Sequence, residues 1–309
     1  MRRWVAPVLF ILLLAEIAAA VSIVLAQPGG FGSLASFDWG PERSQAIPAR
    51  VLELNGQPAS INLKNSSGNI QVSTNPGLTG VQVSATKIVH SNDASAFDRV
   101  RFDVTQSGGS IQIEGGSNQP SIGLSNARVD IQVVLPPALL TSFTATTGSG
   151  DVDVRGLQNG KALLNINTGS GDISGDTLQF SQAVLHTGSG NIRTSNYNGG
   201  INAETGSGNI DMQGSNELNQ VRFKTSSGNI TVNAQLNDPA GGSFDTGSGN
   251  IRLHMANATA PGFNINVGSG DIRVNLPGVV FNRQDKHNVQ TNGSPVVQMH
   301  TGSGNVEIN

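Results

Sequence analysis

A short glycine-rich motif, [Gly/Ser]-Ser-Gly-[Asp/Asn]-[Ile/Val], recurs nine times along this chain of 309 residues. The copies begin at residues 66, 148, 169, 188, 206, 226, 247, 268 and 302, and neighbouring copies from 148 to 268 are 18 to 21 residues apart. Self-similarity at a fixed period of this size is typical of repeat architectures. Glycine reaches positive φ at low steric cost, so the motif indicates a sharp corner that every repeat must make.

Alternation of apolar and polar residues flanks the motif on both sides. Ile230-Thr231-Val232 and Ile272-Arg273-Val274 follow two of the copies, and apolar residues recur at every second position before them. Period-two alternation indicates strands with one buried face. Strands this short cannot bury a face alone, so the units are expected to stack. The sequence therefore predicts an all-β fold, a single-chain β-solenoid (β-helix-like) of about 20-residue coils, with a hairpin-built sandwich or barrel as the alternative.

Two positions of the repeat carry polar side chains of constant type. A threonine directly precedes seven of the nine copies, with Asn65 and Val267 as the exceptions. The fourth motif position is always Asn or Asp, which can bond locally to the turn backbone. Stacking would turn these side chains into a ladder. The predicted structural turn ladder comprises Asn69, Asp151, Asp172, Asn191, Asn209, Asn229, Asn250, Asp271 and Asn305.

The N-terminus is predicted to carry an export signal. Arg2 and Arg3 precede an apolar stretch, residues 4–26, that is interrupted by Glu16. About 20 apolar residues suffice to cross a bilayer, and arginines before the stretch favour a cytoplasmic N-terminus. Residues 1–26 are therefore predicted to be one apolar helix, either a transmembrane signal anchor in contact with the membrane or a cleaved signal peptide. Both alternatives place the rest of the chain outside the cytoplasm, as a single-pass protein of the cell membrane or as a secreted protein.

The remainder divides into three predicted parts. Residues 27–46, rich in Gly, Ser and Pro, read as a flexible linker. Residues 47–140 are predicted to form an atypical N-terminal part of the β-solenoid, and residues 141–309 its regular repeats. The sequence stops in an expected strand, 306–309, with nothing following to cap the stack. An uncapped edge invites pairing with another chain, which predicts a homo-oligomer through the solenoid end.

The sequence argues against several kinds of chemistry. Cysteine is absent, which excludes disulfides and thiolate sites, and the net charge of −3 gives no reason to expect a nucleic-acid partner. The motif lacks the period of calcium-binding nonapeptide repeats and the Lys-Ser/Thr of a phosphate-binding loop. The outward residues after the turns include acidic, basic and uncharged side chains. Arg193 and Asp211 are expected to form a surface ion pair. No catalytic, cofactor-binding or metal site is predicted, and no cofactor.

The residues also resemble a known family. Asn65-Ser66-Ser67-Gly68-Asn69-Ile70, then Val134-Leu135-Pro136, then serial Thr-Gly-Ser-Gly-[Asp/Asn]-Ile units resemble the bacterial putative-adhesin domain family of unknown function, over residues 47–309. The resemblance implies an extracytoplasmic β-solenoid-like domain, often attached to a membrane segment, and it supplies no catalytic residues.

The expected function is a non-catalytic, cell-surface, adhesin-like role, structural or binding, with a surface glycan or an envelope protein as partner. One alternative is an envelope-stress or signalling accessory that binds a membrane partner, suggested by Glu16 inside the apolar stretch. The other is a carbohydrate-active solenoid enzyme, which the outward residues favour least, because they show no paired carboxylates in adjacent units.

Overall fold

A computed structural model describes residues 40–117, 127–236, 241–255, 261–294 and 296–309 of the chain. Residues 42–309 form one compact unit. β-strand is the main secondary structure of the described part, which also contains two short 3-10 helices at Ala94–Arg99 and Pro137–Leu139. The prediction of an all-β fold is confirmed. The predicted apolar helix at residues 1–26 lies outside the described residues, and within them no helix is long and apolar enough to span a bilayer.

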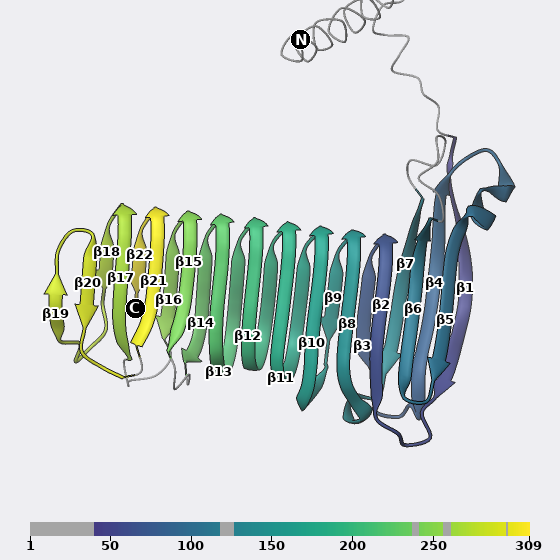
Figure 1. The fold of residues 1–309 in the computed structure, drawn as a ribbon, viewed down its shortest axis with the longest axis horizontal. Coiled ribbons are helices and arrows are strands. Elements are labelled where there is room, and N and C mark those ends of the chain that lie inside the picture. Colours follow the sequence, from purple (N-terminus) through teal and green to yellow (C-terminus); the bar gives the residue numbers. More distant parts are fainter. Residues whose placement is uncertain (1–39, 118–126, 237–240, 256–260, 295) are drawn as a thin grey trace, which may run out of the picture. The chain divides into compact units, whose positions relative to one another are not determined.

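The strands form two layers that are joined at the corners (Figure 1). We call the layer of strands that precede the turns the front layer, and the layer of strands that follow them the back layer. Three long strands, β11 (Ile173–Ser189), β12 (Ile192–Ser207) and β13 (Ile210–Ser227), start in the back layer, bend, and continue in the front layer. The regular coils comprise β8 (Leu140–Ser149), β9 (Val152–Arg155), β10 (Gln158–Ser170), β11 (Ile173–Ser189), β12 (Ile192–Ser207), β13 (Ile210–Ser227), β14 (Ile230–Leu236), β15 (Gly242–Ser248) and β16 (Ile251–Met255).

Neighbouring coils pair in parallel and in register. On β10, Thr168 lies opposite Thr147 of β8 on one side and Thr187 of β11 on the other. The same motif positions stay aligned through β12 and β13. This is a solenoid-like arrangement, and it explains the constant residue type at equivalent positions, because each side chain packs against its own counterpart one coil away. Antiparallel pairs are confined, among the described strands, to the two ends of the stack.

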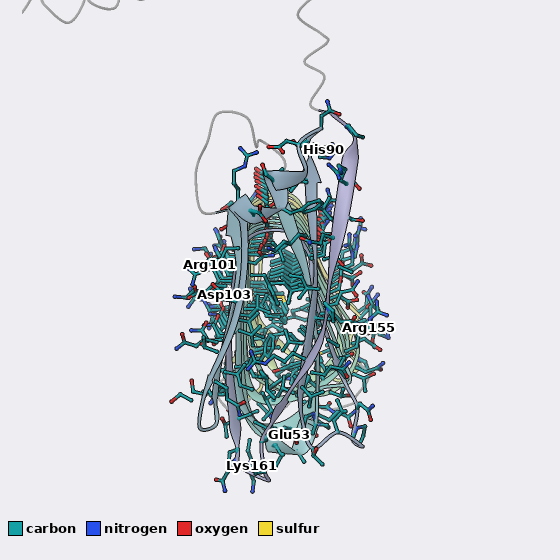
Figure 2. The ribbon with its side chains drawn as sticks, turned by 90° about the vertical axis from the view of Figure 1, so that its right-hand side faces the viewer. Glu53, His90, Arg101, Asp103, Arg155 and Lys161 are labelled. Carbon is teal, nitrogen blue, oxygen red and sulfur yellow. The ribbon has the colours of Figure 1, made fainter. Side chains whose placement is uncertain are left out.

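The core lies between the two layers, where the inward side chains meet (Figure 2). Alternation places every second residue of a strand there, as in β2, whose buried and exposed residues alternate along its length. Phe223 and Phe244, from adjacent coils, are both buried and meet edge to face with ring centroids 5.4 Å apart. Such a column of like side chains runs through the stack because the repeat places apolar residues at the same depth in each coil.

The N-terminal end is closed by strands that leave the coil pattern. It contains β1 (Glu42–Glu53), β2 (Ala59–Ser67), β3 (Ile70–Thr74), β4 (Gly80–His90), β5 (Val100–Ser107), β6 (Ser110–Ser117) and β7 (Arg128–Leu135). β2 and β3 form the first regular coil. In one layer, β6 pairs in parallel with β2, and β5 pairs antiparallel with β6. In the other layer, β7 pairs in parallel with β3, β4 pairs antiparallel with β7, and β1 pairs antiparallel with β4. Side chains tie the outermost strands β1 and β5 together, since Gln106 Nε2 donates to the Glu53 carbonyl at 2.9 Å.

The start of β1 corrects one predicted boundary. Residues 42–46, assigned to the flexible linker 27–46, pair with β4 as part of β1. Glu42 lies 3.3 Å from His90 and 3.5 Å from Arg128, so the polar composition of this stretch serves contacts at the edge of the sheet. Residues 27–39 of the predicted linker lie outside the described residues.

The C-terminal coils stack out of sequence order. They comprise β17 (Gly262–Ser269), β18 (Ile272–Val274), β19 (Phe281–Gln284), β20 (Asn288–Thr291), β21 (Val296–Ser303) and β22 (Val306–Ile308). The last coil, β21–β22, lies between β15–β16 and β17–β18, and pairs in parallel with both. The expectation that strand 306–309 forms the uncapped end of the stack is therefore wrong. Charge gives a physical reason: Glu307 separates Arg252 from Arg273, which sequence order would have placed side by side.

The end of the stack is formed instead by β17 and β18. β20 pairs antiparallel with β17 and covers its outer edge in the front layer. In the back layer, β18 pairs only with β22 among the described strands, so its outer edge is open.

Candidate functional site

The Gly-Ser-Gly corner brings the backbones of successive coils unusually close. Gly171 has φ +148°, and a Cβ atom added there would lie 2.1 Å from the carbonyl oxygen of Gly150 in the preceding coil. A Cβ atom at Gly169 would lie 2.5 Å from the carbonyl oxygen of Gly148. Only glycine fits both positions, because any side chain would overlap the backbone of the neighbouring coil.

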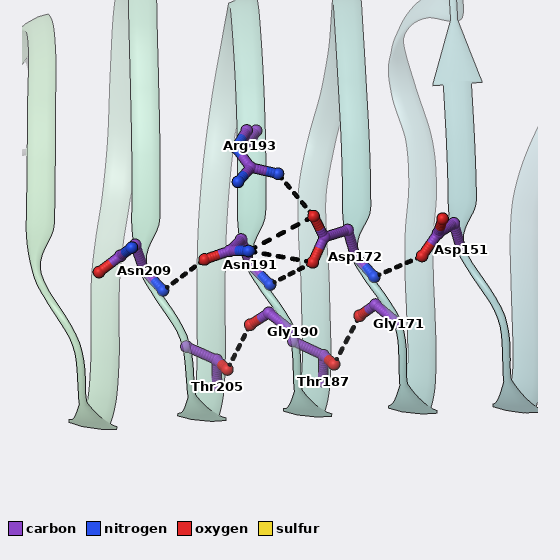
Figure 3. Close-up of polar contacts among 9 residues, drawn as sticks. All are labelled: Asp151, Gly171, Asp172, Thr187, Gly190, Asn191, Arg193, Thr205 and Asn209. Atoms are coloured by element: carbon purple, nitrogen blue, oxygen red, sulfur yellow. Dashed lines mark hydrogen bonds and ion pairs between the residues drawn. The ribbon is translucent and has the colours of Figure 1, made fainter.

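All nine residues predicted for the turn ladder lie in one line along these corners. The Oδ1 atoms of eight of them accept a hydrogen bond from the backbone N–H of the next rung, at 2.7 to 3.0 Å, as Figure 3 shows for Asp151 through Asn209. Asp271, the last rung, accepts no such bond among the described residues. The bonds join different coils, whereas the residue type alone suggested a bond within the same turn. The order along the stack is Asn69, Asp151, Asp172, Asn191, Asn209, Asn229, Asn250, Asn305 and Asp271.

The ladder has a tenth rung, Asp130, which lies outside the nine copies of the motif. Asp130 Oδ1 accepts the backbone N–H of Asn69 at 2.9 Å and begins the ladder in β7. Its sequence signal is the pair Asp130-Ile131, which repeats the Asp-Ile ending of the motif without the glycines.

The threonine before each corner forms a second, buried line of bonds. Thr187 Oγ1 donates to the Gly171 carbonyl at 2.9 Å, and Thr205 Oγ1 to the Gly190 carbonyl at 2.8 Å (Figure 3). The same bond recurs at other corners. Of the two exceptions, Asn65 donates to Val129 O at 2.8 Å, whereas Val267 has no hydroxyl to donate.

Asp172 has the most elaborate contacts of the ladder. Burial alone would raise its pKa, but hydrogen bonds from the Asn191 backbone N–H and from Arg193 outweigh burial and lower the pKa. Arg193 Nη1 lies 2.6 Å from Asp172 Oδ2. The expected pairing of Arg193 with Asp211 is therefore wrong: the guanidinium reaches back to the ladder instead.

The outer face of the back layer carries a shallow depression of about 400 Å³. Two of its carboxylates are firmly held: Asp153 by Arg155 at 2.6 Å, and Asp176 by Ser195 Oγ at 2.5 Å. The hydrogen bond from Ser195 is the main reason that the pKa of Asp176 is lowered. A general acid needs a raised pKa, so Asp176 is suited to hold charge and accept hydrogen bonds.

The outer face of the front layer carries rows of polar residues that follow the coil register. Lys224 lies 3.5 Å from Glu204 one coil away, and Asp245 lies opposite His300. His186 belongs to the same row, and the coils of Glu204, Lys224 and Asp245 separate it from His300. Among the described residues, no three His, Asp or Glu side chains gather to hold a metal ion.

Several solved structures match this chain over most of its length. A putative adhesin from Bacteroides fragilis is 14% identical, with a TM-score of 0.48, and the match covers 87% of this chain and 97% of that one. A putative lipid binding protein from Parabacteroides distasonis is 16% identical, with a TM-score of 0.49 and coverage of 87% and 97%. A putative adhesin from the same species is 15% identical, with a TM-score of 0.42 and coverage of 87% and 98%.

No curated protein matches the sequence. A family model does: two overlapping matches, over residues 46–241 and 86–309, together span the stack from β1 to β22. The family resemblance expected from the motifs is thus confirmed, and neither the family nor these neighbours are named as enzymes. The chain belongs to the Toastrack DUF4097 family.

Proposed function

We propose that this protein is a non-catalytic, adhesin-like surface module that binds a surface glycan or an envelope protein through its two outer faces. The observation that carries the proposal is the register of the coils. Because equivalent outward residues repeat in line from coil to coil, each face offers parallel rows of hydrogen-bonding and charged groups. Such rows suit an extended polymer or a broad protein surface better than a small molecule, which binds in an enclosed and mostly apolar pocket.

The state of the carboxylates supports a non-catalytic role. Asp172 and Asp176 both have lowered pKa values, and both are engaged by neighbouring side chains. A glycoside hydrolase needs one carboxyl group with a raised pKa beside a second carboxylate. The lowered pKa values of Asp172 and Asp176 therefore favour binding over acid catalysis.

The test is direct binding by the full-length chain in nanodiscs, against a glycan array and immobilised envelope proteins. Two face variants keep the core intact: Glu204→Ala with Lys224→Ala on the front layer, and Arg193→Ala with Asp211→Ala on the back layer. We expect one of them to lose binding while its melting temperature stays within a few degrees of wild type. Absence of any binding, together with unchanged surface behaviour of cells lacking the protein, would contradict the proposal.

The proposed location follows from the sequence of residues 4–26. We propose that this stretch holds the chain in the membrane or directs its secretion, so that the stack lies outside the cytoplasm. A reporter that is active only after export, fused after Asn309, should be active. Removal of residues 1–26 should abolish that activity, and a reporter that stays active without them would count against export by this segment.

A further inference from the structure

The stack ends in a corner whose outward groups are unsatisfied. Three hydrogen bonds join the last two coils at this corner: Gly304 N–H to Ser269 O at 2.9 Å, Val306 N–H to Asp271 O at 3.0 Å, and Asp271 N–H to Asn305 Oδ1 at 2.8 Å. The same three bonds join inner coils at the preceding corners. On the outward side of the last coil the matching groups are the N–H of Gly270, the N–H of Ile272 and the carboxylate of Asp271, and none has a partner among the described residues.

The strand beside this corner is equally incomplete. Ile272 and Val274 of β18 are half-buried, whereas Val306 and Ile308, their neighbours in β22, are fully buried. The difference arises because no described strand lies on the outer side of β18. The front layer is not open in this way, since β20 pairs with β17.

The opposite end of the stack offers no such corner. There Asp130 occupies the ladder position beyond Asn69, and Ile131 N–H bonds to the Asn69 carbonyl at 2.9 Å. Beyond β7, two further antiparallel strands complete the back layer. Among the described corners, the one at Asp271 alone presents an unfilled template for another strand.

Charge indicates which kind of strand fits. Along the outer face of the back layer, Arg252, Glu307 and Arg273 stand side by side, with Arg252 Nε 3.7 Å from Glu307 Oε2. The next position outward therefore has an arginine neighbour and favours a carboxylate. A second copy that paired its own β18 antiparallel about Arg273 would instead place two arginines opposite each other.

β18 already pairs on its inner side with a strand, β22, that does not follow it directly in the sequence. Val306-Glu307-Ile308 reaches the inner side of β18 from beyond the β19–β20 hairpin and has the pattern apolar, acidic, apolar. We propose that the Asp271 corner and the outer edge of β18 bind an extended protein segment of this same pattern, added as a parallel strand. Its backbone N–H would bond to the Asp271 carboxylate, and its acidic side chain would face Arg273. This edge is distinct from the two broad faces, so the inference does not depend on the proposed function.

The probe for this site is a labelled peptide with the sequence of residues 302–309, Gly-Ser-Gly-Asn-Val-Glu-Ile-Asn, titrated against the full-length chain. A matched peptide carries Arg in place of Glu. We expect the first peptide to bind about tenfold more tightly than the second, the effect of one well-placed charge contact. Arg273→Glu should reverse the preference, whereas Arg252→Glu, an equivalent change two coils inside the stack, should leave it unchanged.

A second pair of variants tests the ladder contact. Asp271→Ala removes the acceptor and should weaken binding of the first peptide about tenfold, whereas Asp271→Asn keeps an Oδ1 acceptor and should bind like wild type. Three results would overturn the proposal. One is a peptide affinity that none of these variants changes. Another is a peptide that binds by releasing the chain's own β22. The third is a stable homodimer that Arg273→Glu dissociates, which would assign the edge to a second copy.

Discussion

Asn and Asp share the rungs of the corner ladder because both supply the one atom that the contact needs, an Oδ1 acceptor. Their difference lies in the second side-chain atom, an amide donor in Asn and a charged oxygen in Asp. At Asp172 that second oxygen binds Arg193, so this rung joins the ladder to the outer face. At Asn191 the amide Nδ2 instead donates to Asp172 Oδ1 at 3.1 Å.

The close approach between coils at Gly171 makes a first prediction. Gly171→Ala places a Cβ atom 2.1 Å from a backbone oxygen and at φ +148°, so we expect a loss of about 3 kcal/mol or more in the free energy of unfolding. Gly160→Ala is the matched control, because its Cβ would meet only the flexible Gln179 side chain, at 3.4 Å. Urea denaturation of both variants measures the difference, and equal losses would refute the packing argument.

The lowered pKa of Asp172 makes a second prediction. A carboxylate whose pKa is lower in the folded state stabilises the protein above its unfolded pKa, and that contribution is lost as the pH falls through the folded value. Asp172→Asn keeps the ladder acceptor but loses the ion pair with Arg193. It should cost about 0.5 to 1 kcal/mol at neutral pH, because the pair is partly exposed.

The difference in unfolding free energy between wild type and Asp172→Asn should shrink as the pH falls from about 7 to about 2, as urea denaturation at each pH can show. Asp151→Asn is the control, since Asp151 makes no ion pair among the described residues, and it should change stability by less than about 0.5 kcal/mol. A constant difference across this pH range would contradict the assigned cause.

The motif positions could be predicted from sequence because each coil repeats the same requirement. Asp130 could not, because β7 replaces the glycine corner with a continuous strand and keeps only the acceptor. The ion-pair partner of Arg193 could not be predicted from sequence either. Its long side chain can extend to either neighbouring coil, and only the three-dimensional geometry shows that it binds Asp172.

At the scale of elements, the insertion of β21–β22 between two earlier coils is the least predictable feature. Every coil carries the same corner, so the repeat pattern alone permits several stacking orders. Sequence order is one of them, and it would place Arg252 beside Arg273. The observed order alternates their charges with Glu307. The pairing of β20 with the outer edge of β17 could not be predicted either, because β19 and β20 do not contain the repeat motif.

Engineered disulfides test this order, and the absence of cysteine from the chain makes the experiment clean. Asp245→Cys with His300→Cys should form a disulfide, because these residues face each other on adjacent parallel strands. His300→Cys with Asn266→Cys should form one for the same reason. Asp245→Cys with Asn266→Cys should not, because two strand spacings, about 9.5 Å, exceed the reach of a disulfide.

Non-reducing gel mobility and mass spectrometry after mild oxidation distinguish the three pairs. A disulfide between positions 245 and 266 in the monomer would show that β17 stacks directly on β15, in sequence order.

For the molecule as a whole, stability is spread along one continuous core. Phe223 lies in the middle of the stack, fully buried against Phe244. Phe223→Ala should cost about 3 to 5 kcal/mol, the usual range for a buried phenylalanine. Phe281→Ala, at the end of the stack where the side chain is 39% exposed, should cost less than about 1 kcal/mol.

Thermal unfolding compares the two variants. Similar losses would indicate that the outer β19 strand matters to the core as much as an inner coil does. That result would conflict with the nearest-neighbour behaviour expected of stacked repeats.

The all-β class and the stacking of coils followed from the repeat because period, alternation and corner residues agree. The closure of the N-terminal end did not follow from it. There the strands cover the open side of a single coil. Their contacts, such as that of Gln106 with the Glu53 carbonyl, belong to no repeating pattern.

The intercalated last coil also bears on the order of synthesis and folding. Coils from β10 to β16 can add one by one as the chain emerges, because each stacks on the coil made just before it. The coil at β17–β18 cannot take its final place in that way, since its neighbour β21–β22 is made later. Completion of this end must wait for the synthesis of β21 and β22. The contacts that close it span the longer sequence separations that slow folding. Until those residues arrive, the β15–β16 edge is exposed, so the interval between emergence of residue 255 and residue 309 is the period in which the chain is most open to pairing with other strands.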